Sequence, residues 1–154
     1  MKVRKSIEIA APAEKVWPFL VEPEKIKKWF TSLETFEYLE DQRSGAGTPV
    51  YVEERIPGRI LTVTFVADEW VQNERIILTA TSSNYPTRYH IAWSIEPTDS
   101  GSWFTFLEDF GYPYGIWGKI LDLLGPTVAR ANMAKSLSEL KRLVEAENSR
   151  ELSR

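Results

Sequence analysis

The order of secondary structure in this chain is decided first by residues 2–17, KVRKSIEIAAPAEKVW. In its first half, apolar residues alternate with charged and polar ones, which is the period of a strand with one buried face. An Ala-Pro-Ala-Glu stretch at 11–14 then interrupts the alternation, and Val16, Trp17 and Leu20 follow at helical spacing. We therefore predict a strand over residues 2–10 and a short helix that ends at Pro23.

A second short helix is predicted from Glu24, with Ile26 on its apolar side, and strand signals resume near Leu33. From there to Phe110, alternating segments are separated by turn residues, which predicts about six further strands. The turn signals include Gly45-Ala46-Gly47, Pro57-Gly58, Gln72-Asn73 and Asp99-Ser100-Gly101. Consecutive strands joined by short turns form an antiparallel meander with one inward face.

The last third of the chain has a helical period from about Ile116 to Ala146. Its apolar residues form a ridge of Ile120, Leu124 and Val128, followed by a stripe of Ala134, Leu137, Leu140 and Val144. Gly125-Pro126 is expected to kink this helix or to split it in two. We predict one domain over residues 1–147 and a polar C-terminal tail over 148–154.

Composition excludes several classes of function. The 154 residues carry a formal charge of −3 with Lys and Arg scattered among acids, which does not favour nucleic-acid binding. No apolar run approaches the roughly 20 residues of a membrane span, and no signal-peptide pattern precedes the first strand, so we expect a cytoplasmic protein without stable membrane insertion. With no Cys, one His and no phosphate-binding glycine loop, neither a metal nor a cofactor is expected.

Four segments together resemble the SRPBCC superfamily, the START-like and polyketide cyclase-like proteins. They are Ile7–Trp17, Trp29 after Pro23, Ile95–Ser102 and Leu137–Glu145. The resemblance implies an α+β helix-grip fold, in which a curved antiparallel seven-stranded sheet surrounds a long C-terminal helix in the order β-α-α-β-β-β-β-β-β-α. It also implies a ligand cavity between the sheet and that helix, without naming the ligand.

Large apolar side chains are abundant enough to line such a cavity as well as a core. The candidate ligand-binding residues of this kind are Trp29, Phe30, Phe65, Trp93, Phe104, Phe106, Trp117, Leu121, Leu124 and Val128, with Trp29 and Phe30 expected near the entrance. Polar groups inside the cavity could come from Tyr51, Tyr89 or Thr64.

Glu108 is the candidate catalytic residue, because it shares strand parity with Phe106 and Phe110 and so faces the cavity or its rim. An apolar wall would raise the pKa of its carboxyl and make it a proton donor or acceptor. His90 is expected on the outer face of its strand. The Glu53-Glu54-Arg55 run alternates sides, so only one of the two acids could face a site, and solvated charge is the expected role of both.

The leading hypothesis is a protein that binds or carries a small hydrophobic or aromatic molecule, such as a lipid or a polyketide-like metabolite. One alternative is an enzyme of the polyketide cyclase, dehydrase or hydrolase type that uses the same cavity, and a second is a protein-partner module such as a chaperone activator. The helix segment 116–124 is expected to act as a gate. Oligomeric state is left open.

Overall fold

The computed structural model describes residues 1–85, 88–111 and 115–154, apart from the side chains of Trp117 and Leu121. In these parts of the chain, strands form one antiparallel sheet in the order β1-β7-β6-β5-β4-β3-β2. The strands are β1 (Lys2–Ile9), β2 (Leu33–Tyr38), β3 (Pro49–Ile56), β4 (Arg59–Val71), β5 (Arg75–Ser83), β6 (Tyr89–Pro97) and β7 (Ser102–Phe110). The predicted seven-stranded meander is confirmed.

Short helices occupy the connection between β1 and β2, and a long helix ends the chain. They are α1 (Ala13–Val16), α2 (Pro18–Val21), α3 (Pro23–Trp29) and α4 (Ile116–Leu152). The first predicted helix is divided at Trp17, because Pro18 has no N–H to continue the helical hydrogen bonds and instead begins α2. No helix in the described part of the chain has the length and hydropathy of a membrane span.

Backbone geometry explains the tight turns between strands. Gly58 and Asn73 have φ angles of 80° and 64°, a conformation that glycine and asparagine tolerate best. Gly101 is required for a different reason, since a Cβ atom there would lie 2.1 Å from the carbonyl oxygen of Ile9. The turn between β6 and β7 therefore packs directly against the end of β1.

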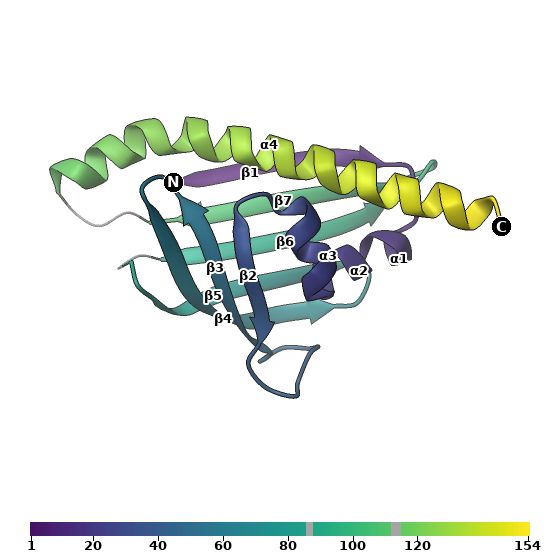
Figure 1. The fold of residues 1–154 in the computed structure, drawn as a ribbon, viewed down its shortest axis with the longest axis horizontal. Coiled ribbons are helices and arrows are strands. Elements are labelled where there is room, and N and C mark those ends of the chain that lie inside the picture. Colours follow the sequence, from purple (N-terminus) through teal and green to yellow (C-terminus); the bar gives the residue numbers. More distant parts are fainter. Residues whose placement is uncertain (86–87, 112–114) are drawn as a thin grey trace.

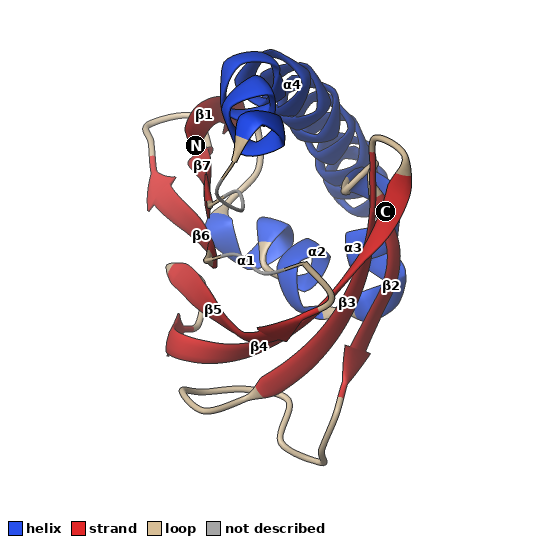
Figure 2. Ribbon diagram, turned by 90° about the vertical axis from the view of Figure 1, so that its left-hand side faces the viewer, coloured by secondary structure: helices blue, strands red, loops and turns tan. Residues whose placement is uncertain are grey.

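The sheet curls around α4, which lies across its open, concave side (Figure 1). Figure 2, viewed nearly along α4, shows β1 on one side of this helix and β2 and β3 on the other, with the short helices at one end. The arrangement is the helix-grip fold, in which α4 is the long helix that lies across the concave face of the described sheet.

The second half of α4 supplies the packing against the sheet. Its buried residues include Met133, Leu137, Leu140 and Val144, which largely match the predicted stripe. The predicted ridge in the first half is different, because Ile120, Leu124 and Val128 are exposed, Leu124 by 60%. Only part of the apolar surface of α4 is therefore covered by the sheet.

Of the two predicted effects of Gly125-Pro126, a split of the terminal helix is wrong, because α4 is one element of 37 residues with Pro126 inside it. Proline removes one backbone hydrogen bond from a helix and favours bending, and the axis of α4 is curved in Figure 1. The helix also continues beyond Glu147 to Leu152, so most of the expected polar tail is helical.

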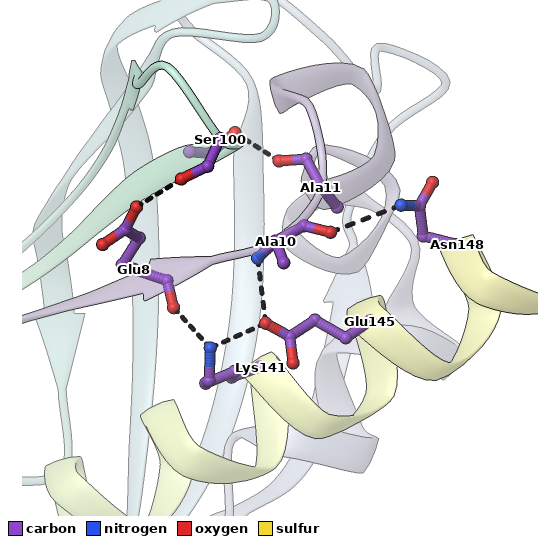
Figure 3. Close-up of polar contacts among 8 residues, drawn as sticks. Glu8, Ala10, Ala11, Ser100, Lys141, Glu145 and Asn148 are labelled. Atoms are coloured by element: carbon purple, nitrogen blue, oxygen red, sulfur yellow. Dashed lines mark hydrogen bonds and ion pairs between the residues drawn. The ribbon is translucent and has the colours of Figure 1, made fainter.

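Polar contacts tie the last turns of α4 to the end of β1 (Figure 3). The Lys141 ammonium donates to the carbonyl oxygen of Glu8 at 2.8 Å and pairs with Glu145 at 2.6 Å. The Glu145 carboxylate in turn accepts from the backbone N–H of Ala10 at 2.9 Å, and Asn148 donates to the Ala10 carbonyl at 3.3 Å. Side chains of α4 thus satisfy backbone groups where β1 ends.

Replacing Glu145 by Ala should lower the free energy of unfolding by about 1 to 2 kcal/mol, because it leaves the Ala10 N–H and Lys141 without this acceptor. Urea unfolding followed by circular dichroism measures the change. The matched control is Glu139→Ala on the same helix, since Glu139 pairs only with Arg142 among the described ion pairs. Equal losses in the two variants would contradict an anchoring role for Glu145.

Candidate functional site

A cavity of about 340 Å³ lies between the concave face of the sheet and the first half of α4. Most of its wall is apolar and includes Phe30, Leu61, Phe106, Phe110, Val128 and Met133. Exposed residues at its edge, such as Pro57 and Leu124, place an opening between the β3–β4 turn and α4. Its size and apolar wall are those of a site for a small molecule.

One carboxyl group lies deep in this apolar wall. Glu54 shares the inner face of β3 with Val50 and Val52, and only 7% of its surface is exposed. The Tyr89 hydroxyl donates to its Oε2 atom at 2.9 Å, and the Ser32 hydroxyl donates to its Oε1 atom at 2.7 Å. These two donors are what make burial of the Glu54 carboxyl tolerable.

A second carboxyl group, that of Glu108, lines the same cavity. Glu108 lies on β7 between Phe106 and Phe110, on the inward face. Tyr89 on β6 pairs with Phe110 in the β6–β7 register and is therefore a neighbour of Glu108. The Tyr89 hydroxyl interacts with both Glu54 and Glu108. We refer to Glu54, Tyr89 and Glu108 as the acid cluster.

The acid cluster is electrostatically unusual. Burial raises the pKa of Glu54, and burial together with the nearby Glu54 charge raises the pKa of Glu108 well above its usual value of 4.5. Burial and the two carboxylates also raise the pKa of Tyr89 well above 10.0. Because two neighbouring carboxyls resist double ionisation, they titrate as a pair that retains a proton more readily than solvated acids.

An aromatic cluster in the core adjoins the cavity through Phe30 and Phe106, which line it. Trp29, Phe30, Trp93, Phe104 and Phe106 pack with ring centroids 5.4 to 6.4 Å apart, mostly edge to face. The Trp29 indole N–H donates to the Phe19 carbonyl at 2.6 Å. Trp29 is fully buried and does not lie at an entrance, which corrects the predicted position.

The structure brings about half of the predicted site residues to the cavity. Phe30, Tyr89, Phe106, Glu108, Leu124 and Val128 line it. Phe65, Trp93 and Phe104 are buried in the core and, like Trp29, do not line the cavity. The side chains of Trp117 and Leu121 lie outside the described residues.

Two proposed polar groups face away from the cavity. Tyr51 alternates with the buried Val50 and Val52, and its hydroxyl donates to Glu53 at 2.9 Å on the outer face. Thr64 alternates in the same way with Val63 and Phe65. Contrary to expectation, neither Tyr51 nor Thr64 therefore supplies a polar group to the cavity.

His90 lies on the outer face of β6, as the alternation predicts. Its Nδ1 atom is 2.9 Å from the Thr79 hydroxyl, which donates to Asp68. This contact is separate from the acid cluster, because Tyr89 and Ile91 on either side of His90 point inward.

Sequence reasoning missed Glu54. The expectation of solvated charge holds for Glu53 but is wrong for Glu54, which is buried. The alternation along β3 does indicate the inward position of Glu54, because Glu54 has the same parity as Val50 and Val52. It also missed Ser32, Asn132, Met133 and Ser136, which line the cavity from loop and helix positions that strand parity does not address.

Comparison with known proteins gives a consistent assignment. Residues 1–145 match the sequence model of the family described as polyketide cyclase / dehydrase and lipid transport. No curated protein sequence matches the chain.

Several solved structures share the fold. The chain is similar to TTHA0849 from Thermus thermophilus, with a TM-score of 0.80, 22% identity and coverage of 96% of this chain and 99% of that one. It is similar to the ZhuI aromatase/cyclase from Streptomyces sp. R1128, with a TM-score of 0.78, 17% identity and coverage of 94% and 93%. A START superfamily protein from Mycobacterium smegmatis gives a TM-score of 0.68, 17% identity and 95% coverage of both chains.

The raised pKa values predict how stability depends on pH. A carboxyl whose pKa is higher in the folded than in the unfolded chain stabilises the fold fully below its unfolded pKa, and that contribution is lost as pH rises through the folded pKa. Glu108→Gln, which cannot ionise, should therefore become more stable relative to the unsubstituted protein between pH 5 and pH 8.

Urea unfolding of both proteins at the two pH values measures this difference. Asp109→Asn is the control, because Asp109 is adjacent in sequence, and its hydrogen bond with Arg88 lowers its pKa from 3.8, below this pH window. The same pH trend in both variants would rule out burial of the Glu108 carboxyl as the cause.

Proposed function

Because the chain belongs to the polyketide cyclase/dehydrase and lipid transport family, we propose that it binds or carries a small hydrophobic or aromatic molecule in the cavity between the sheet and α4. The observation that carries the proposal is the cavity of about 340 Å³ with its mainly apolar wall. Transfer of an apolar molecule from water to such a wall is favourable at roughly 25 cal/mol per Å² of buried apolar surface.

The first half of α4 is the proposed gate to this cavity. Leu124 and Val128 line the cavity and are exposed, whereas the polar contacts to β1 begin further along the helix, at Lys141. Movement of residues 116–128 would open the cavity without breaking the anchored end of α4. Moving this segment should cost little free energy, because it also carries exposed residues that are not packed in the core, namely Ile116, Ile120 and Leu123.

Filling the cavity should weaken the binding of an apolar ligand. Ala129→Trp places an indole where Ala129 lines the cavity, whereas Ala131→Trp makes the same change at an exposed position outside the wall. We expect N-phenyl-1-naphthylamine, an uncharged apolar fluorophore, to bind the unsubstituted protein and Ala131→Trp, and to bind Ala129→Trp at least about tenfold more weakly. Fluorescence titration measures the three affinities, and equal affinity in both variants would contradict binding in this cavity.

A second candidate function, acid–base catalysis, is favoured by one observation. The cavity holds a phenol hydroxyl, that of Tyr89, that interacts with two carboxyls, and such a group of titratable side chains can support proton transfer to or from a bound substrate. Glu108 is the proposed proton acceptor, because it lines the cavity and its raised pKa makes it a stronger base when ionised.

Proton abstraction can be tested on a simple aromatic ketone. In D₂O, a catalytic Glu108 should exchange the methyl protons of acetophenone for deuterium about 100-fold faster than buffer does, as measured by proton NMR. Glu108→Gln should return the rate to that of buffer, and Glu53→Gln, on the outer face, should not. Exchange at the buffer rate with the unsubstituted protein would count against proton abstraction from ketones of this kind.

A further inference from the structure

We propose that the cavity selects molecules that combine an apolar body with a protonated amine at one end, and that this amine binds the carboxyls of Glu54 and Glu108. The inference rests on the proposed function, because it requires that the cavity takes a ligand. It goes further by assigning the charge and hydrogen-bonding character of the ligand's polar end.

The acid cluster presents acceptors to the cavity. The hydroxyls of Ser32 and Tyr89 direct their protons to the two oxygens of Glu54, at 2.7 and 2.9 Å. A hydroxyl that donates to a carboxylate keeps only its oxygen lone pairs for a ligand. The polar part of the wall formed by Ser32, Glu54, Tyr89 and the ionised Glu108 therefore favours a ligand group that donates hydrogen bonds.

Two residues with basic groups, Arg55 and Met1, line the cavity, and each basic group has a described partner other than Glu54 and Glu108. Arg55 is exposed at the edge of the cavity and pairs with Glu34. The Met1 ammonium donates to the Phe110 carbonyl at 2.7 Å, and its charge lowers the pKa of Asp109 on the outer face. Among the described residues, no ion pair joins a Lys or Arg side chain to Glu54 or Glu108. Residues 86–87 and 112–114 contain no basic side chain.

The charge of the ligand's polar end determines which ligands the cavity favours. An alkylammonium group has three donors and would compensate negative charge that the apolar wall leaves poorly solvated. A carboxylate end would add a further negative charge beside two acids and would be rejected. An alcohol end could donate one hydrogen bond but would compensate no charge.

The affinity for an amine should depend on pH in a definite direction. An alkylammonium stays protonated up to about pH 10, like lysine, so the titrating partners are Glu54 and Glu108. The ammonium binds their ionised form, and that form becomes more populated as pH rises. Tyr89 stays protonated throughout this range, because its pKa lies well above 10.0. Amine affinity should therefore increase from pH 6.0 to pH 8.5.

Three ligands with the same ten-carbon chain separate these effects. Displacement of N-phenyl-1-naphthylamine from the unsubstituted protein should show that decylamine binds at least about tenfold more tightly than decanoate and more tightly than decanol at pH 8.5. Only decylamine should gain affinity between pH 6.0 and pH 8.5, since decanol carries no charge.

Substitution of each glutamate tests whether the amine binds at these two carboxyls. Glu108→Gln and Glu54→Gln should each lower decylamine affinity at pH 8.5 by about tenfold or more and flatten its pH dependence, while decanol affinity changes little. The control is Glu53→Gln, an identical substitution on the outer face of β3, where Glu53 accepts from Thr35 at 2.8 Å. It should leave all three affinities unchanged.

The outcomes distinguish this inference from the proposed function. If decanol or decanoate binds as tightly as decylamine, or if neither glutamate variant alters the preference, the amine selectivity is overturned while apolar binding stands. If the fluorophore and all three ligands fail to bind the unsubstituted protein, both are overturned.

Discussion

The structure depends on the packing of one face of α4 against a sheet that curves around it. Met133, Leu137, Leu140 and Val144 bury that face, and Lys141 and Glu145 hold the same part of the helix to the end of β1. A single helix has too narrow an apolar stripe to fill a concave sheet along its whole length. Where α4 is anchored, a core forms. Where its apolar residues are exposed, around Leu124 and Val128, the space between helix and sheet is the cavity.

The strands that form the core also place the polar groups of the cavity. The inner faces of β3, β6 and β7 continue from the core into the cavity, so the same alternation that buries Val52 and Phe106 also turns Glu54, Tyr89 and Glu108 inward. Acids in such a wall are costly unless they are hydrogen-bonded or share a proton. Because burial raises their pKa values, ionisation of these carboxyls at neutral pH is expected to cost stability, and they place polar groups inside an apolar cavity, a combination common at functional sites.

Strand periodicity explains which features could be predicted from sequence. Alternation and turn residues were sufficient for the seven strands and for the inward face of β6 and β7, including Glu108. Glu54 lies inward and Tyr51 outward on β3, opposite to the expectation for each, because a charged residue is usually solvated and an aromatic one is often buried. The division of the first helix at Trp17 has a local cause in Pro18. The Gly125-Pro126 pair is compatible with either a kink or a break, so the continuity of α4 could not be decided from it. The lining by Ser32 and Asn132 depends on tertiary packing, which no local pattern contains.

Burial in the apolar cavity beside α4 raises the pKa values of both the Glu54 and the Glu108 carboxyl. Carbon-13 NMR titration of the glutamate side-chain carboxyls tests this effect directly, with and without saturating N-phenyl-1-naphthylamine. We expect Glu54 and Glu108 to titrate above the usual 4.5, and the apolar ligand to raise both pKa values further by excluding water, without affecting Glu53. Ordinary titration of both carboxyls near 4.5, unchanged by the ligand, would contradict it.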